Sequence, residues 1–329
     1  MKVIVATKYG PPEVLQIKEI KKPVPAENEI LVKVYATTVS AADYRVRSFN
    51  VPISFWLPAR FALGLTKPRN SVLGMDFSGV VDAVGRNVTK YKVGDPVFGL
   101  MGHQFGCYAQ YLCLSEDWKL VGIAGKPANL NFEEAAAIPF GGLTALYFMR
   151  EAKIQKGQKV LITGASGSVG TYAVQIAKYY GAEVTAVCRT DKIELVKSLG
   201  ADKIIDYTKD DFTKNGESYD VIFEVAGKTP FSDCIKSLTK TGTLLHAVAV
   251  PAVTIQMKWE SITTGRKMVG GGPENNSEDL IFLRELIESG KLKPIIDRSY
   301  PMEQIVEAHK YVGSGNKKGN VVVAIEHNN

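Results

Sequence analysis

Residues Lys159–Gly181 read KVLITGASGSVGTYAVQIAKYYG, and this stretch decides the fold of the chain. The apolar run 160–163 predicts a buried strand, and Gly164, Gly167 and Gly170 follow it before an apolar pattern of helical period begins. A strand that turns on glycines into a helix leaves room for a pyrophosphate and directs the amides of the helix start toward its oxygens. The stretch predicts a dinucleotide site; the alternative is a strand-to-helix turn without a ligand.

Strand and helix patterns alternate after this turn. We expect strands at 183–188, 203–206, 221–224, 243–248 and 266–269, and helices at 192–199, 231–238, 279–289 and 302–311. This alternation predicts a parallel sheet covered by helices on both faces, in which strand 266–269 is the last. A final strand, 320–325, is expected to return to the first half of the chain.

The first 126 residues are rich in strand patterns. Candidate strands are 2–7, 29–38, 79–84, 95–99 and 107–114, separated by turn signals. They predict a twisted β-barrel. Asn131 then begins a helix with carboxylates near its positive end, and a second helix covers 143–151.

The composition is that of a soluble protein with two domains. The chain has 329 residues, of which 45% are apolar and 22% are charged. Its net charge of +6 is dispersed, so we expect no nucleic-acid partner. We expect no membrane partner and a cytoplasmic location, since the N-terminal apolar run is too short for a signal peptide and no run is long enough to span a membrane. The four cysteines form no CxxC pair and are expected to be reduced and buried.

The end of the second strand decides which nucleotide binds. Sites that select NAD place Asp or Glu there, about 20 residues after the glycines, to hold the ribose 2′-hydroxyl. Here Arg189 replaces the acid. Arg189, Lys192 and Tyr207 are suited to surround a 2′-phosphate, and we expect no acid to compete for it. The alternative for Lys192 is a solvated lysine.

Four stretches in this order resemble the medium-chain dehydrogenase/reductase superfamily. They are LGMDFSGVVDAVG at 73–85, VGDPVFG at 93–99, AAAIPFGGLTAL at 135–146, and the glycine turn with its helix. The sequence is most similar to the zinc-free quinone oxidoreductase branch, which includes zeta-crystallin and plant alkenone reductases. The resemblance covers nearly the whole chain.

The resemblance implies an α/β protein with a GroES-like β-barrel catalytic domain, residues 1–127 and 273–329, and a Rossmann domain, residues 128–272. It implies NADPH between the two, with Lys192 and Tyr207 at the 2′-phosphate, Thr144 against the nicotinamide and Lys318 as a closing basic residue. We expect the cofactor to be bound by Thr144, Gly164, Ser166, Gly167, Ser168, Val169, Gly170, Arg189, Lys192, Tyr207, Val248 and Lys318.

The chain lacks the zinc ligands of related alcohol dehydrogenases. Those enzymes carry Gly-His-Glu where residues 74–76 are Gly-Met-Asp, and a Cys where this chain has Ser40 or Ala41; their four-cysteine lobe is also missing. Because Met75 is a poor zinc ligand, we expect no metal. His103, Cys107 and Cys113 are a minor alternative zinc site; the main interpretation is that they are buried strand residues.

The candidate catalytic residues lie in SAADYRVR at 40–47. Quinone reductases read Asn-Pro-x-Asp with a Tyr two positions after the Asp; here the Asp is Asp43, Ser40 replaces the Asn, and Arg45 stands at the Tyr position. Without zinc, hydroxyls must polarise the substrate oxygen, so Tyr44 and Ser40 are candidates and Asp43 is an orienting or proton-relay group. In the alternative interpretation, Asp43 only caps a turn and Tyr44 is a core residue.

Residues 50–70 read NVPISFWLPARFALGLTKPRN and do not fit the barrel pattern. One interpretation is a buried crossover loop with a short helix; another is a lid over an apolar substrate pocket, lined by Phe55, Trp56 and Phe61. Contact with a membrane surface is a third, weaker one.

These observations predict a zinc-independent oxidoreductase that uses NADPH to reduce quinones or α,β-unsaturated carbonyls. The alternatives are a zinc-type alcohol dehydrogenase and an NADPH-binding sensor or crystallin-like protein without turnover. The expected partners are a small apolar carbonyl or quinone and a second copy of the chain, paired at the edge strand 266–269.

Overall fold

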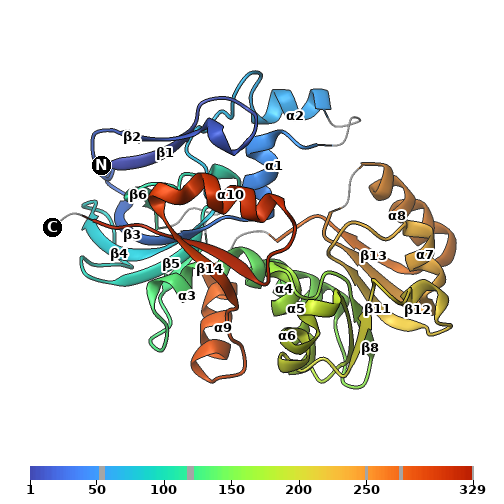
Figure 1. Cartoon of the computed structure of the whole chain (residues 1–329). Helices are drawn as coiled ribbons and strands as arrows, with labels where there is room; N and C mark the ends of the chain where they lie inside the picture. Colours follow the sequence, from blue (N-terminus) through green and yellow to red (C-terminus); the bar gives the residue numbers. More distant parts are fainter. Residues whose placement is uncertain (52–55, 117–121, 249–250, 274–276, 328–329) are drawn as a thin grey trace. The chain divides into compact units, whose positions relative to one another are not determined.

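The computed structural model describes residues 1–51, 56–116, 122–248, 251–273 and 277–327, and Figure 1 traces the chain. By the contacts between its residues, the chain divides into two units. The first unit comprises Met1–Phe140, Glu274–Gly290 and Pro294–Asn329, and the second comprises Gly141–Pro273 and Lys291–Lys293.

The second unit is built on a parallel sheet. Within the described residues, its six strands lie in the order β10-β9-β8-β11-β12-β13 (Figure 1). Their bounds are Lys159–Ile162 (β8), Glu183–Cys188 (β9), Lys203–Asp206 (β10), Tyr219–Glu224 (β11), Leu238–His246 (β12) and Lys267–Gly270 (β13). The chain winds outward from β8 to β10 and then from β11 to β13, so the doubly wound sheet predicted from the sequence is confirmed.

The first helix of this unit precedes β8, and the others connect the parallel strands. The helices are α4 (Pro139–Ala152), which begins in the first unit, α5 (Ser168–Tyr179), α6 (Ile193–Ser198), α7 (Phe231–Lys236) and α8 (Pro251–Thr264), with a 3-10 turn η4 (Thr190–Lys192). The sequence did not predict α8. Its apolar side chains Ile255, Trp259 and Ile262 are exposed, and β-branched residues, which are weak helix formers, are frequent in it.

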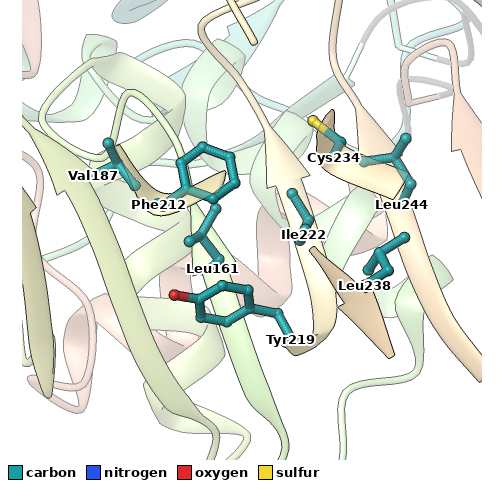
Figure 2. Close-up of a cluster of buried hydrophobic side chains, with 8 residues drawn as sticks. All are labelled: Leu161, Val187, Phe212, Tyr219, Ile222, Cys234, Leu238 and Leu244. Atoms are coloured by element: carbon teal, nitrogen blue, oxygen red, sulfur yellow. The ribbon is translucent and has the colours of Figure 1, made fainter. Parts of the chain in front are cut away.

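One face of the parallel sheet carries the apolar core shown in Figure 2. Leu161, Ile222 and Leu244 come from three neighbouring strands, β8, β11 and β12. Cys234 of α7 and the buried ring of Phe212 pack with them. This apolar layer supports the sheet, whose carboxyl ends carry the polar residues described below.

The first unit is a mainly antiparallel β structure. Its large sheet has the order β14-β15-β3-β4-β5-β7, and β6 also pairs with β3. The bounds are Glu29–Thr38 (β3), Asp76–Val84 (β4), Pro96–Leu100 (β5), Tyr111–Ser115 (β6), Gly122–Gly125 (β7), Ile296–Pro301 (β14) and Asn320–Ala324 (β15), with a separate pair Lys2–Ala6 (β1) and Leu15–Glu19 (β2). The sequence did not predict β2, β7 or β14. β2 and β14 are largely polar, with β2 mostly exposed and β14 mostly half-buried, and β7 has four residues.

The C-terminal segment returns to this unit, as expected. β15 pairs antiparallel with β3, with Val322 opposite Thr38. The helices of the unit are α1 (Ala41–Ser48), α2 (Trp56–Leu63), α3 (Phe132–Ala136), α9 (Ser277–Glu288) and α10 (Ile305–Gly313). Through this return, α10 packs against α1, which carries the candidate catalytic residues.

Residues 128–140 lie with the first unit by contact, whereas the expected domain limits place them in the second. Asn131 caps α3 with a capping box, as the sequence predicts. Ala136 and Ala137 then pack with Ala36 of β3 and Val322 of β15 in a buried apolar cluster. This packing holds the segment against the β structure of the first unit.

Candidate active site

The glycine turn follows β8 and leads into α5. Gly164 has a φ of 60°, a left-handed conformation that glycine adopts readily. A Cβ atom on Gly170 would lie 2.2 Å from the carbonyl oxygen of Gly164, so a side chain there would prevent this close packing. Gly167, which has no side chain, is the N-cap of α5, and the first amides of a helix have no partner within it. This cradle of amides fits a pyrophosphate.

The other predicted residues of this region lie around the turn. Ser166 precedes the N-cap, and Ser168 and Val169 are the first two residues of α5. Thr144 lies on α4, three residues after Gly141. A Cβ atom on Gly141 would lie 2.8 Å from the carbonyl oxygen of Ser168. The helix that carries Thr144 therefore packs closely against the start of α5.

The loop after β11 closes the same edge of the sheet. The hydroxyl of Thr163 accepts hydrogen bonds from the amides of Val225 and Ala226, at 3.0 and 3.3 Å. A Cβ atom on Gly227 would lie 3.3 Å from the Cβ of Val248. The carboxyl ends of β8, β11 and β12 thus meet here, where open α/β sheets bind their ligands.

The end of β9 brings together the three residues predicted for the 2′-phosphate. The amide of Tyr207 donates to the carbonyl of Cys188 at 3.1 Å, and the amide of Lys192 donates to the carbonyl of Arg189 at 2.9 Å. Lys192 is only 6% exposed, unlike the solvated lysine of the alternative interpretation. The ring of Tyr207 is exposed.

The expectation that no acid competes at this position is wrong. Arg189 donates from Nε to Oδ1 of Asp191 at 2.6 Å and from Nη2 to Oδ2 at 3.0 Å. This hydrogen bonding lowers the pKa of Asp191 to about 2. Hydrogen bonds from the hydroxyls of Thr190 and Thr208 lower the pKa of Asp206 at the end of β10. The prediction rested on Arg189, which directly follows the strand, whereas Asp191 stands two positions later.

Lys318 lies in the first unit, in the turn before β15. Its amide donates to a carboxylate oxygen of Asp297 at 2.8 Å, and the hydroxyl of Tyr311 donates to the same oxygen at 2.6 Å. These bonds fix the backbone of the turn. The role of the Lys318 side chain toward a cofactor stays a prediction.

Ser40 and Asp43 form the capping box of α1. The Ser40 hydroxyl donates to Oδ2 of Asp43 at 2.6 Å, the Ser40 amide donates to the same oxygen at 2.9 Å, and the Asp43 amide donates back to the hydroxyl at 3.2 Å. Oδ1 of Asp43 accepts from the amide of Gly74 at 3.0 Å. Burial raises the pKa of Asp43 to about 6, although these bonds favour the charged form. The geometry agrees with the alternative in which Asp43 caps a turn.

Tyr44 is the half-buried member of the predicted group. A Cβ atom on Gly313 would lie 2.9 Å from Cε2 of the Tyr44 ring, so the ring packs against the end of α10. The guanidinium of Arg47 lies 5.4 Å from the centre of the same ring. Tyr44 is therefore fixed on one side, and it is not a fully buried core residue.

Asp76 is a buried carboxyl that the sequence analysis treated only as a replaced zinc-site residue. It accepts hydrogen bonds from the hydroxyl of Thr38 and, at 2.8 Å, from the amide of Phe140. Burial, together with the nearby charge of Asp43, raises the pKa of Asp76 to about 7. Asp43 of α1 and Asp76 of β4 are therefore two buried carboxyls with raised pKa values.

Three more buried side chains connect α1 to α10. Arg47 Nε donates to Nδ1 of His309 at 3.2 Å, and the Tyr108 hydroxyl lies 3.1 Å from Nε2. Because arginine has no acceptor, Nδ1 must be unprotonated and the neutral ring carries its proton on Nε2. Burial and the charge of Arg47 lower the pKa of His309 to about 3. Sequence reasoning missed this network because Arg47 and His309 are 262 residues apart.

Residues 56–70 form a short helix and a turn whose apolar side chains are largely exposed. The first interpretation was right about the helix and wrong about burial: Trp56, Phe61 and Leu65 are exposed. The guanidinium of Arg60 lies 4.0 Å from the ring centre of Phe49 and 4.8 Å from that of Trp56, and it anchors α2. Phe55 lies outside the described residues.

The residues at the zinc positions do not fit zinc. The Ser40 hydroxyl is bonded to Asp43, and Met75 is buried with only a thioether to offer. Of the alternative set, His103 is exposed while Cys107 is buried. Across the described ranges, no group of three or more His, Cys, Asp or Glu is placed to hold a metal ion. None of the described helices is long and apolar enough to cross a membrane.

Comparisons with known proteins agree with this architecture. The chain matches the alcohol dehydrogenase GroES-like domain over residues 26–125 and the zinc-binding dehydrogenase family over residues 199–323. It is 34% identical to a 2-methylene-furan-3-one reductase of Solanum lycopersicum over 98% of this chain and 79% of the relative. It is 31% identical to a chloroplast envelope quinone oxidoreductase homolog of Arabidopsis thaliana over 94% of this chain and 93% of the relative.

Among solved structures, the quinone oxidoreductase from Coxiella burnetii is similar, with a TM-score of 0.86 and 30% identity over 99% of each chain. An NAD-dependent alcohol dehydrogenase has a TM-score of 0.84 and 29% identity over 99% of this chain and 100% of that chain. The chain therefore belongs to the medium-chain dehydrogenase/reductase superfamily, in its quinone oxidoreductase-like branch, and is an oxidoreductase.

Proposed function

We propose that this protein uses NADPH to reduce quinones or α,β-unsaturated carbonyls by a hydride transfer that needs no zinc. The observation that carries the proposal is the amide cradle at the start of α5, with Lys192 and Arg189 at the end of the next strand. A relative with 31% identity over 98% of this chain is named NADPH-dependent alkenal/one oxidoreductase, from Arabidopsis thaliana.

NADPH, when bound, supplies the hydride from its nicotinamide ring. The amides of the glycine turn would hold the pyrophosphate, and Lys192, Arg189 and Tyr207 would hold the 2′-phosphate. Thr144 and Val248 would contact the nicotinamide half, and Lys318 would supply a further basic group. Two observations support these assignments. The sequence resembles quinone reductases, and the assigned residues of the second unit lie around one edge of its sheet.

The first unit supplies the groups for the carbonyl oxygen. The Ser40 hydroxyl donates to Asp43, and both oxygens of Asp43 accept hydrogen bonds, so we assign these two residues to positioning α1. Tyr44 is the residue we assign to polarise the oxygen and deliver a proton, because its phenol is a donor on the helix that this capping box fixes. The exposed Trp56 and Phe61 are proposed to cover bulky apolar acceptors.

The competing function is an NADPH-binding protein without turnover. A panel of enones and quinones, followed by the absorbance of NADPH, separates the two. Consumption of NADPH that depends on the acceptor and persists after treatment with a chelator supports the proposal. Tight binding of NADPH with no consumption across the panel favours a sensor. Turnover that disappears when a chelator removes bound zinc would favour an alcohol dehydrogenase.

We also propose that the protein is a homodimer in the cytoplasm. β13 is the last strand of the parallel sheet, and such an edge can pair with a second copy. Cell fractionation tests the location, because a relative from Arabidopsis thaliana is named chloroplastic and one from Mus musculus is named mitochondrial.

A further inference from the structure

We propose that Asp191 narrows the preference of this enzyme for NADPH over NADH by competing with the 2′-phosphate of NADPH for Arg189. This inference rests on the proposed function, because it concerns the same nucleotide site. It assigns a role to Asp191, which the proposed function leaves without one.

The geometry of the pair is the first argument. Arg189 directs Nε and Nη2 at the two oxygens of Asp191, at 2.6 and 3.0 Å. A guanidinium binds a phosphate through the same two parallel donors. The carboxylate thus occupies the donors that a phosphate at this position would use, and the phosphate must displace it.

A phosphate can displace the Asp191 carboxylate from Arg189 at a small cost in free energy. The side chains of Arg189 and Asp191 are 37% and 47% exposed, and ion pairs with such access to water are weak. A phosphate that carries nearly two charges binds a guanidinium more strongly than this carboxylate does. After displacement, however, the Asp191 charge remains close to the phosphate and repels it, so the competition reduces the affinity without abolishing it.

Asp191 is also placed to favour NADH. NAD-selective sites place an acid about 20 residues after the glycines, where it accepts the ribose 2′-hydroxyl. Asp191 stands in this segment, directly after Arg189 and Thr190. One carboxylate therefore favours the hydroxyl of NADH and disfavours the phosphate of NADPH. Asp191 narrows the preference for NADPH that Arg189 and Lys192 create.

The test measures binding by calorimetry for four probes: NADPH, NADH, adenosine 2′,5′-bisphosphate and adenosine 5′-monophosphate. Asp191→Asn removes the charge with little change in shape. The matched control is Asp233→Asn, since Asp233 also forms a surface ion pair in the second unit, with Lys236 at 3.3 Å. Thermal unfolding shows that both variants are folded.

We expect Asp191→Asn to bind the bisphosphate and NADPH about three- to tenfold more tightly, with NADH and the monophosphate unchanged or weaker. The gain should shrink at high ionic strength, because salt screens the repulsion that the substitution removes. Asp233→Asn should leave all four affinities unchanged. Unchanged or weaker binding of the bisphosphate by Asp191→Asn would overturn the inference, since Asp191 would then be a bystander or a support for Arg189.

The outcomes separate this inference from the proposed function. Normal NADPH turnover together with an unaltered cofactor ratio in Asp191→Asn sinks the inference alone. The expected gain in bisphosphate binding, without consumption of NADPH by any acceptor, supports the inference and sinks the proposed enzyme activity.

Discussion

Lys192 is the residue whose loss should separate the two cofactors most clearly. Its side chain is nearly buried at the end of β9, and a charge-assisted contact with phosphate is worth about 1.5 to 3 kcal/mol. Lys192→Ala should therefore weaken NADPH binding roughly ten- to a hundredfold and leave NADH binding nearly unchanged. Lys197→Ala, an exposed lysine on α6, is the control for the change in net charge. Equal losses of both cofactors in calorimetry would refute a phosphate role.

Asp76 makes stability depend on pH in an unusual direction. Its pKa is raised by burial from 3.8 in the unfolded chain to about 7 in the folded protein. Folding therefore takes up a proton between these values, so the charged carboxyl opposes folding above about pH 7, and this penalty disappears as the pH falls toward about 4. An amide at this position can still accept from Phe140 and donate to Thr38.

Asp76→Asn should accordingly raise the free energy of unfolding by roughly 1 to 3 kcal/mol at about pH 8, and the two proteins should converge near pH 4. Denaturant titrations at both pH values measure this. Asp82→Asn on the same strand, where the carboxylate pairs with Lys22 at 2.7 Å on the surface, should show no such convergence. A variant that is less stable at both pH values would contradict the account.

At this scale the sequence identified residues whose roles follow from local position. Arg189, Lys192 and Tyr207 follow strands whose ends can be read from the sequence, and the structure brings them together. The shifted pKa values of His309 and Asp76 were not predicted, because they arise from burial and from partners far away in the chain. No spacing rule connects such residues.

We propose that α2 is the element that selects between large and small acceptors. Trp56 packs edge-on against Phe49, with ring centres 6.0 Å apart, and keeps part of its ring exposed. If this exposed face covers the substrate, Trp56→Ala should raise the Michaelis constant for large enones or quinones severalfold more than for small ones and leave NADPH affinity unchanged, because apolar contact contributes about 25 cal/mol per Å². Trp56→Phe should retain most of the preference. An equal loss for both substrate sizes would assign Trp56 to packing alone.

Elements were predictable where periodicity and turn chemistry agreed. The glycine turn between β8 and α5 and the strands β9 and β10 follow directly from the sequence. α8 was missed although Ile255, Trp259 and Ile262 stand at helical spacing, because β-branched residues, which are weak helix formers, are frequent in it. β14 was missed because it is largely polar. The capping box of α1 was anticipated only as an alternative role of Asp43.

For the whole molecule, we predict a dimer with a mass of twice 35.9 kDa in sedimentation. α8 contacts the edge strand β13 and exposes Ile255, Trp259 and Ile262 at helical spacing, with 69%, 70% and 81% of their surfaces accessible. A second copy paired at β13 can cover this stripe. Trp259→Glu should therefore shift the mass toward the monomer, whereas Trp56→Ala should not. A monomer at every concentration tested would contradict the prediction.

The central claim is that hydride passes from NADPH to a conjugated carbonyl. The most direct test supplies an enone with NADPH that carries deuterium at both hydrogen positions of nicotinamide C4, and locates the label in the product by NMR. We predict one deuterium on the β-carbon of the saturated product, with the same outcome after treatment with a chelator. A product without label, or a labelled alcohol formed only when zinc is bound, would contradict the account.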